Sequence, residues 1–163
     1  MSLRALGVAA AASTIAFVSS AFVTSSAQPL PAACSLLTRA EIQSAIGATG
    51  PMAPAGPFCQ GQSQNRRVVL RIAHRAIAED TETRGIQAFR NMGGVVDVRR
   101  DGDITCSTAI PPASMAAQVG YNTTCSVRHA NVVAAIEVAA PTQATMVSIA
   151  RLRPLADILA GRF

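Results

Sequence analysis

The sequence predicts an α+β domain with two disulfides, in which an antiparallel sheet of about five strands has helices packed on one face. Half of the 163 residues are apolar and only 14% are charged, a composition that supports a packed core rather than a disordered chain. Two pairs of strand-like segments flank short turns, which is typical of antiparallel hairpins. Four cysteines in a chain with an export-signal pattern predict two disulfides.

Residues 1–27 have the pattern of a secretory signal peptide. Arg4 is followed by the apolar run 5–23 and by a small-x-small cleavage pattern. We therefore expect a signal peptide at 1–27, a single domain at 28–163, a periplasmic or secreted location, and no stable membrane span after cleavage. Two alternatives stay open: the apolar run is just long enough for an uncleaved anchor, and Cys34 follows a loosely lipobox-like sequence.

The four cysteines allow three pairings, and we favour the pairs that are neighbours in the sequence, Cys34–Cys59 and Cys106–Cys125. An even count also disfavours lipidation of Cys34, which would leave one cysteine without a partner. No Cys-x-x-Cys motif occurs, so the redox and zinc sites that use this spacing are not indicated.

Local signals predict the first elements in order. Thr38 and Glu41 form a capping box that starts a helix over 39–46, and Gly47 is suited to end it. Residues 48–58 are rich in glycine and proline and predict a loop.

Alternation predicts a strand over 66–76, with one apolar and one basic face. The basic face carries Arg67, Arg71 and Arg75. A helix follows, with acids at its start, where they suit the helix dipole, and with Gly93-Gly94 at its end.

The second half is expected to hold two hairpins and a final helix. Asp101-Gly102 and Ala130-Asn131 mark the hairpin turns, and we expect Pro154 to kink or break the last helix because its ring nitrogen has no proton to donate. The predicted ranges are 95–100, 104–110, 123–128, 132–139 and 142–160.

The charge pattern points to a surface rather than to a reaction centre. All 14 positive residues are arginine, the net charge is +5, and aromatic residues make up only 4%. Nucleic-acid binding is disfavoured, because such proteins commonly combine clustered basic residues with stacking aromatics. The basic strand face, with Arg128 as a possible continuation across the sheet, forms an arginine stripe suited to an extended acidic surface. A solvated face without a partner is the competing interpretation.

No catalytic, metal-binding or cofactor-binding motif is recognised. His74 and His129 are the histidines available for acid–base chemistry. His74 shares the parity of the apolar strand face, and His129 falls at a turn. The acids at 79–82 lack the spacing of a calcium loop. We therefore predict no catalytic residue, no metal site and no cofactor.

The segment 34–41 (Cys-Ser-Leu-Leu-Thr-Arg-Ala-Glu), the later Cys59 and the closing 152–156 resemble an uncharacterised family of small exported bacterial proteins. Many of these proteins are actinobacterial lipoproteins whose domain begins with a Cys-x-Leu-Leu-Thr-x-x-Glu helix. Gln60 stands where an aromatic residue commonly follows the second cysteine. The resemblance implies the same fold class and export, and it brings over no catalytic residue.

The function expected from these observations is an exported, non-catalytic binding or envelope-associated module. Its basic sheet face, formed by Arg67, Arg71, Arg75 and Arg128, would dock a protein or an anionic envelope component. The alternatives are a small exported hydrolase that uses His74 or His129 with an acid such as Asp97, and a membrane-anchored structural subunit.

Overall fold

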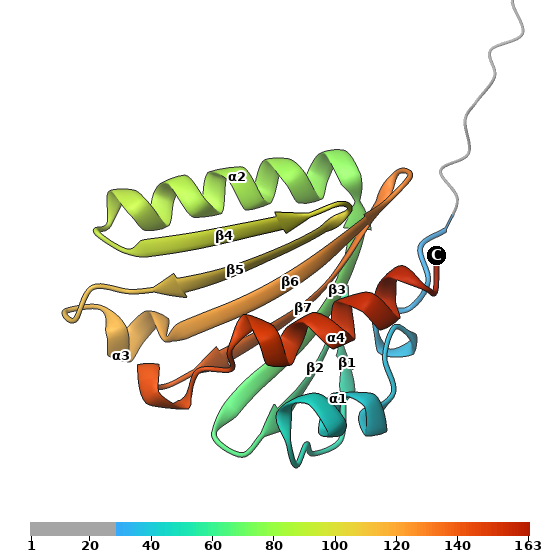
Figure 1. The fold of residues 1–163 in the computed structure, drawn as a ribbon, viewed down its shortest axis with the longest axis horizontal. Helices are drawn as coiled ribbons and strands as arrows, with labels where there is room; N and C mark the ends of the chain where they lie inside the picture. Colours follow the sequence, from blue (N-terminus) through green and yellow to red (C-terminus); the bar gives the residue numbers. More distant parts are fainter. Residues whose placement is uncertain (1–28) are drawn as a thin grey trace, which may run out of the picture.

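The computed structural model describes residues 29–163, and the predicted signal peptide lies outside this range. The described residues form one antiparallel sheet of seven strands in the order β1-β2-β3-β7-β6-β5-β4 (Figure 1). The strands are β1 Ala53–Ala55, β2 Phe58–Ser63, β3 Arg66–His74, β4 Val95–Asp101, β5 Ile104–Ile110, β6 Tyr121–His129 and β7 Val132–Ala140. The helices are α1 Arg39–Ile46, α2 Arg75–Asn91, α3 Ala116–Val119 and α4 Ile149–Ala160, with short 3-10 helices η1 Ala33–Ser35 and η2 Gln143–Thr145.

The α+β class and the antiparallel sheet are confirmed, but the predicted number of about five strands is wrong. The two additional strands are β1 and β2, which form a hairpin where the sequence predicted a loop and a cysteine-bearing connection. Pro54 lies in β1, and β1 is an edge strand, the place in a sheet where the missing N–H of proline is tolerated.

The sheet is built from two meanders that meet in its middle. Strands β1 to β3 follow one another in space, then α2 leads to the opposite edge, and β4 to β7 return until β7 pairs with β3. This places residues 66–74 beside residues 132–139, so the centre of the sheet depends on pairing between distant parts of the chain.

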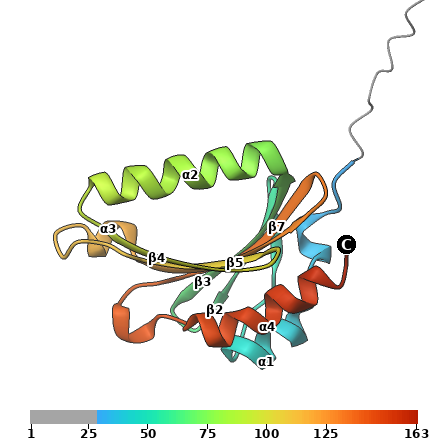
Figure 2. The ribbon, with the colours of Figure 1, turned by 45° about the horizontal axis from the view of Figure 1, so that its top comes forward.

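The core lies on one face of the sheet, which α1 and α4 cover (Figure 2). One row of buried residues crosses five strands through register pairs. Its members are Cys59, Leu70, Ile136, Cys125 and Cys106. From α4, Leu152, Leu155 and Leu159 pack onto this face.

The prediction that all helices pack on one face is wrong, because α2 lies over the opposite face (Figure 2). Each residue of α2 remains at least partly exposed. A polar sheet face explains this arrangement, since the strands expose hydroxyl and arginine side chains there and offer α2 little apolar surface to bury. We call this surface the α2-side face.

Several local predictions are confirmed. Helix α1 spans Arg39–Ile46 with the complete capping box: the Thr38 N–H donates to the Glu41 carboxylate at 2.7 Å, and the Glu41 N–H donates to the Thr38 hydroxyl at 3.3 Å. The disulfides are Cys34–Cys59 and Cys106–Cys125, the pairing favoured from the sequence.

Within residues 29–163, no helix is both long and apolar enough to cross a membrane.

Strands β4, β6 and β7 extend one or two residues beyond the predicted ranges, and two further boundaries differ for an identifiable reason. Strand β3 ends at His74 rather than continuing to residue 76, because its partner β7 begins at Val132, opposite His74. The final helix begins at Ile149 after the separate turn η2, and it continues through Pro154 without interruption.

Candidate functional site

The alternation of β3 extends into the neighbouring strands and defines the α2-side face. Arg71 pairs in register with Ala135, which pairs with Ser126. Ser126 pairs with Thr105, and Thr105 pairs with Arg100. One row across five strands therefore has an arginine at each end and small residues between them. The adjacent row contains Val69, Glu137, Thr124, Ser107 and Val98.

The structure separates the four predicted arginines into two groups. Arg67 and Arg71 lie on the α2-side face of β3, as expected from the alternation. Arg75 is the first residue of α2 and not part of the strand. Arg128 lies on the same sheet face but at its far end, under α2. The predicted single stripe is therefore replaced by two separate groups.

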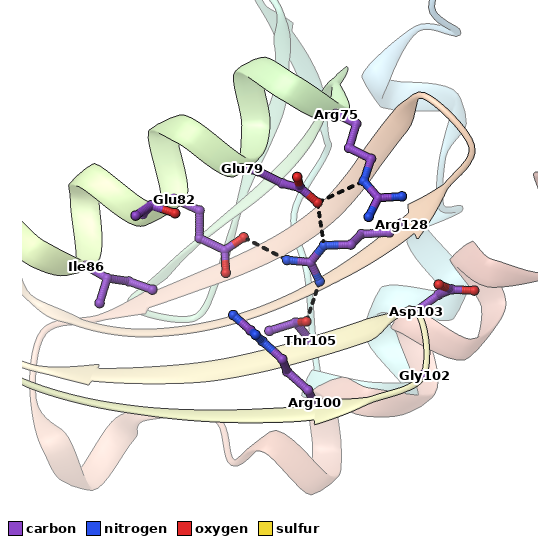
Figure 3. A pocket seen from close by; sticks show the side chains of 10 residues that line it. Arg75, Glu79, Glu82, Ile86, Arg100, Gly102, Asp103, Thr105 and Arg128 are labelled. Atoms are coloured by element: carbon purple, nitrogen blue, oxygen red, sulfur yellow. Dashed lines mark hydrogen bonds and ion pairs between the residues drawn. The ribbon is translucent and has the colours of Figure 1, made fainter.

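Arg128 holds α2 to the sheet through a cluster of charged and polar groups (Figure 3). Its Nε atom lies 3.1 Å from Glu79 Oε1, its Nη2 atom lies 3.6 Å from Glu82 Oε2, and its Nη1 atom donates to the Thr105 hydroxyl. Arg75 Nε contacts the same Glu79 oxygen at 2.9 Å. Because the Arg128 side chain is only 15% exposed, these partners neutralise a cation that water reaches poorly. We call these five residues the Arg128 cluster.

Glu79 is the bridging acid of the Arg128 cluster. Hydrogen bonds from Arg75 and Arg128 hold the pKa of its carboxyl below the usual value, since both donors stabilise the ionised form. Glu79 therefore stays charged between two guanidinium groups. Two of the four arginines predicted for binding are consequently already paired within the chain.

Three adjoining cavities lie between α2 and the sheet. The first, of 460 Å³, is lined by the Arg128 cluster together with Arg100 and Asp103 (Figure 3). The second, of 500 Å³, lies between the C-terminal half of α2 and β4. The third, of 250 Å³, lies over β5 and β6 and reaches Arg71. All three share Ile86, so together they form one groove beneath α2.

Three arginines that line the groove form no ion pair with an acid of residues 29–163: Arg71, Arg90 and Arg100. Arg67, which lies on the same face of β3 as Arg71, has no such partner in that range either. Glu137 of β7 pairs in register with Val69 and so lies diagonal to both Arg67 and Arg71. Diagonal neighbours are about 7–8 Å apart, a separation at which Glu137 reduces the positive potential without cancelling it.

Sequence reasoning missed Arg100 and four hydroxyl residues of the groove: Thr105, Ser107, Thr124 and Ser126. The sequence does contain a signal for the four hydroxyl residues, because they alternate in their strands with the apolar residues Ile104, Cys106, Cys125 and Val127. It was overlooked because a polar face opposite a core is the ordinary pattern of an antiparallel strand.

The histidines do not come together with Asp97. His74 precedes α2, and the ring of His129 stacks on Phe163 with centroids 6.2 Å apart. Asp97 lies in the same register row as Val68, whereas His74 and His129 lie together in another row. Val68 is six residues before His74, so about 20 Å of strand separates the row of Asp97 from the row of the histidines. The His–Asp97 pair considered for a hydrolase is therefore not assembled. In the part of the chain that the structure describes, no group of three or more His, Cys, Asp or Glu residues is arranged to hold a metal ion.

No protein-family model, curated protein or solved structure matches the chain. The resemblance to small exported bacterial proteins consequently stays a prediction. The candidate site rests on the geometry of the groove and of the α2-side face alone.

Proposed function

We propose that the chain is an exported binding module that docks an acidic protein surface of the cell envelope through the α2-side face. The observation that carries this proposal is the position of Arg67 and Arg71. Arg67 is exposed on this face, Arg71 lies on the same strand and lines the groove beneath α2, and within residues 29–163 neither pairs with an acid. Arginine suits such a role because its planar guanidinium binds carboxylates through two parallel hydrogen bonds.

Export is supported by two independent features. The predicted signal peptide directs the chain out of the cytoplasm. Two disulfides with no free cysteine in the described range fit an oxidising compartment, where such bonds persist. A periplasmic or secreted location is accordingly part of the proposal.

The experiment is cross-linking and affinity recovery from native envelope extract, with the wild-type chain compared with two double variants. Arg67→Ser with Arg71→Ser removes the proposed contact. Arg84→Ser with Arg99→Ser is the matched control, since these side chains are 76% and 72% exposed and Arg99 points to the opposite face.

We expect a partner that wild type and the control recover and that the Arg67/Arg71 variant loses. Binding of the purified partner should weaken as salt rises, because exposed charges are screened within about 10 Å at 0.1 M ionic strength. Equal recovery by all three proteins, or recovery of no partner, contradicts the proposal. Recovery of an anionic glycan or lipid instead of a protein would replace the proposed partner class.

A further inference from the structure

The 250 Å³ cavity beneath the middle of α2 has a floor of hydroxyl side chains. Register pairs place Thr105 opposite Ser126 and Ser107 opposite Thr124, so four hydroxyls form a two-by-two array on β5 and β6. The strand amides beneath them belong to the sheet ladder. Side chains therefore supply the donors that a ligand would meet on this floor.

Two of these hydroxyls are already used inside the protein. Ser126 donates to the Thr105 carbonyl at 3.3 Å, and the Thr105 hydroxyl accepts from Arg128. Ser107 and Thr124 have no side-chain hydrogen bond to any residue in 29–163. Arg71 lines the same cavity and has no ion pair within that range. A guanidinium and two free hydroxyls thus line one small cavity.

We propose that this cavity binds a small molecule through an oxyanion, a carboxylate or a phosphate, held by the Arg71 guanidinium and the Ser107 and Thr124 hydroxyls. A guanidinium offers two parallel N–H donors to an oxyanion, and hydroxyl donors complete its coordination. The cavity is smaller than the roughly 300–1,000 Å³ of sites for drug-sized ligands, which favours a small ligand. This site is additional to the proposed docking surface, with which it shares Arg71.

Among residues 29–163, Glu82 is the one acid that lines this cavity, while Glu137 lies on the same face as the register partner of Thr124. Removal of the Glu82 charge gives a test in which binding should become stronger. The Glu82 carboxylate lies 3.6 Å from Arg128 Nη2, so its charge is partly balanced. The remaining negative charge opposes an incoming anion. Arg71→Gln should consequently weaken oxyanion binding, whereas Glu82→Gln should strengthen it.

The experiment is an amide NMR titration of the disulfide-intact full chain at low ionic strength, with inorganic phosphate in one arm and malate in the other. We expect saturable shifts around 105–107, 124–126 and 81–86, with a dissociation constant on the order of 1 mM or tighter, the equivalent of about 4 kcal/mol. Tighter binding of phosphate or of malate identifies the oxyanion. Absence of a saturable shift with both probes overturns the proposal.

Variants separate this site from diffuse attraction. Arg71→Gln, and independently Ser107→Ala with Thr124→Val, should each weaken binding about tenfold or more, a loss of roughly 1.4 kcal/mol. Arg67→Gln is the matched control, because Arg67 does not line the cavity, and it should bind like wild type. Equal losses in Arg67→Gln and Arg71→Gln, or unchanged binding in the hydroxyl variant, overturn the proposal.

The hydroxyl variant also distinguishes the two proposals from each other. Ser107→Ala with Thr124→Val keeps Arg67 and Arg71, so it should still recover the macromolecular partner while it loses the oxyanion. If the envelope partner does not exist, the titration with phosphate and malate is unaffected. Failure of one proposal therefore leaves the other open to its own test.

Discussion

The carboxylate of Glu41 contacts two parts of the fold, the start of α1 and the C-terminal end of the chain. It accepts the Thr38 N–H in the capping box and pairs with Arg162 near the C-terminal end at 2.6 Å. The hydrogen bond from the Thr38 backbone is the largest cause of the lowered pKa of this carboxyl. Burial opposes it, and the Thr38 side chain and the contacts with Arg162 add to the lowering. Glu41 thereby ties the start of α1 to the residues that follow α4.

A lowered pKa in the folded state predicts a specific pH dependence for Glu41→Gln. The ionised carboxylate stabilises the fold fully above its unfolded pKa of about 4.3, and this stabilisation is lost as pH falls through the lower folded value. Near neutral pH the variant should unfold at lower denaturant concentration than wild type. The difference should shrink in acid, measured by guanidinium unfolding at several pH values. A difference that stays constant down to the folded pKa contradicts this account.

At the scale of single residues, the capping box was predicted correctly from the sequence, whereas the position of Arg75 was not. The capping box was predictable because all its partners lie within four residues. Arg75 was assigned to the strand because alternation of arginines continues through it. In the structure its N–H donates to the Asn131 carbonyl at 2.7 Å, in the turn before β7. Strand β3 ends where its partner β7 begins, and the local sequence of β3 does not reveal where that partner lies.

At the scale of elements, α2 is a helix held mainly at its ends. The Arg128 cluster holds the N-terminal half. Near the C-terminal end, the Phe89 ring lies where a side chain on Gly94 would be, only 2.1 Å from an ideal Cβ, so this contact requires glycine. Arg90 also donates to the Val96 carbonyl at 3.4 Å. The helix thus spans the groove without filling it.

Arg128→Met tests this description of α2. The variant keeps an unbranched apolar stem but leaves Glu79 and Glu82 without the sheet-based cation, so the N-terminal half of α2 should open more often. Amide hydrogen exchange over 75–86 should accelerate about fivefold to tenfold, while exchange in β6 and β7 changes little. Arg84→Met is the control, because in residues 29–163 the one ion pair of Arg84 is with Asp80, on the exposed side of α2. Unchanged exchange in α2 would show that Arg128 does not hold the helix.

The elements that were mispredicted share one physical cause. Strand β1 has only three residues and contains Pro54, so its sequence shows no alternation. It is extended because it pairs with β2. In α2, the apolar Ile86 and Phe89 resemble a core-facing stripe, yet Ile86 lines the groove and the Phe89 ring lies against Gly94. In both cases the outcome depends on the surface presented by a distant segment, whereas helix 39–46 and the hairpin at Asp101-Gly102 depend on neighbours in sequence.

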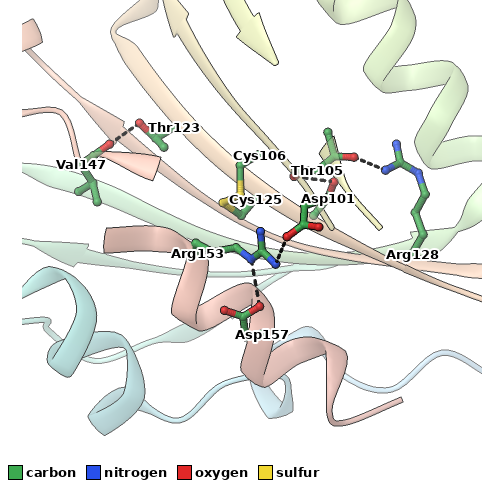
Figure 4. Close-up of a disulfide and its surroundings, with 10 residues drawn as sticks. Asp101, Thr105, Cys106, Thr123, Cys125, Arg128, Val147, Arg153 and Asp157 are labelled. Atoms are coloured by element: carbon green, nitrogen blue, oxygen red, sulfur yellow. Dashed lines mark hydrogen bonds and ion pairs between the residues drawn. A yellow bond between two sulfur atoms is a disulfide. The ribbon is translucent and has the colours of Figure 1, made fainter. Parts of the chain in front are cut away.

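At the scale of the molecule, the sheet divides the protein into a buried side and an open side. The α1/α4 side contains the core row and both disulfides, and Arg153 of α4 joins Asp101 of β4 to Asp157 near the Cys106–Cys125 bond (Figure 4). The α2 side contains the groove and the free arginines. This separation allows binding residues to change without loss of the core, which is why Arg67→Ser with Arg71→Ser should remain folded.

The two disulfides provide a test at this same scale. They span nearly equal separations of 25 and 19 residues, so restriction of the unfolded chain predicts nearly equal losses of roughly 3 kcal/mol when either pair is replaced by alanine. Cys106 and Cys125 face each other in the ladder that joins β5 to β6, whereas Cys34–Cys59 joins η1 to β2. Guanidinium unfolding of both double variants measures the two losses. A much smaller loss for Cys106→Ala with Cys125→Ala would mean that pairing of β5 with β6 already restricts the unfolded chain, and the entropic argument would then hold only for Cys34–Cys59.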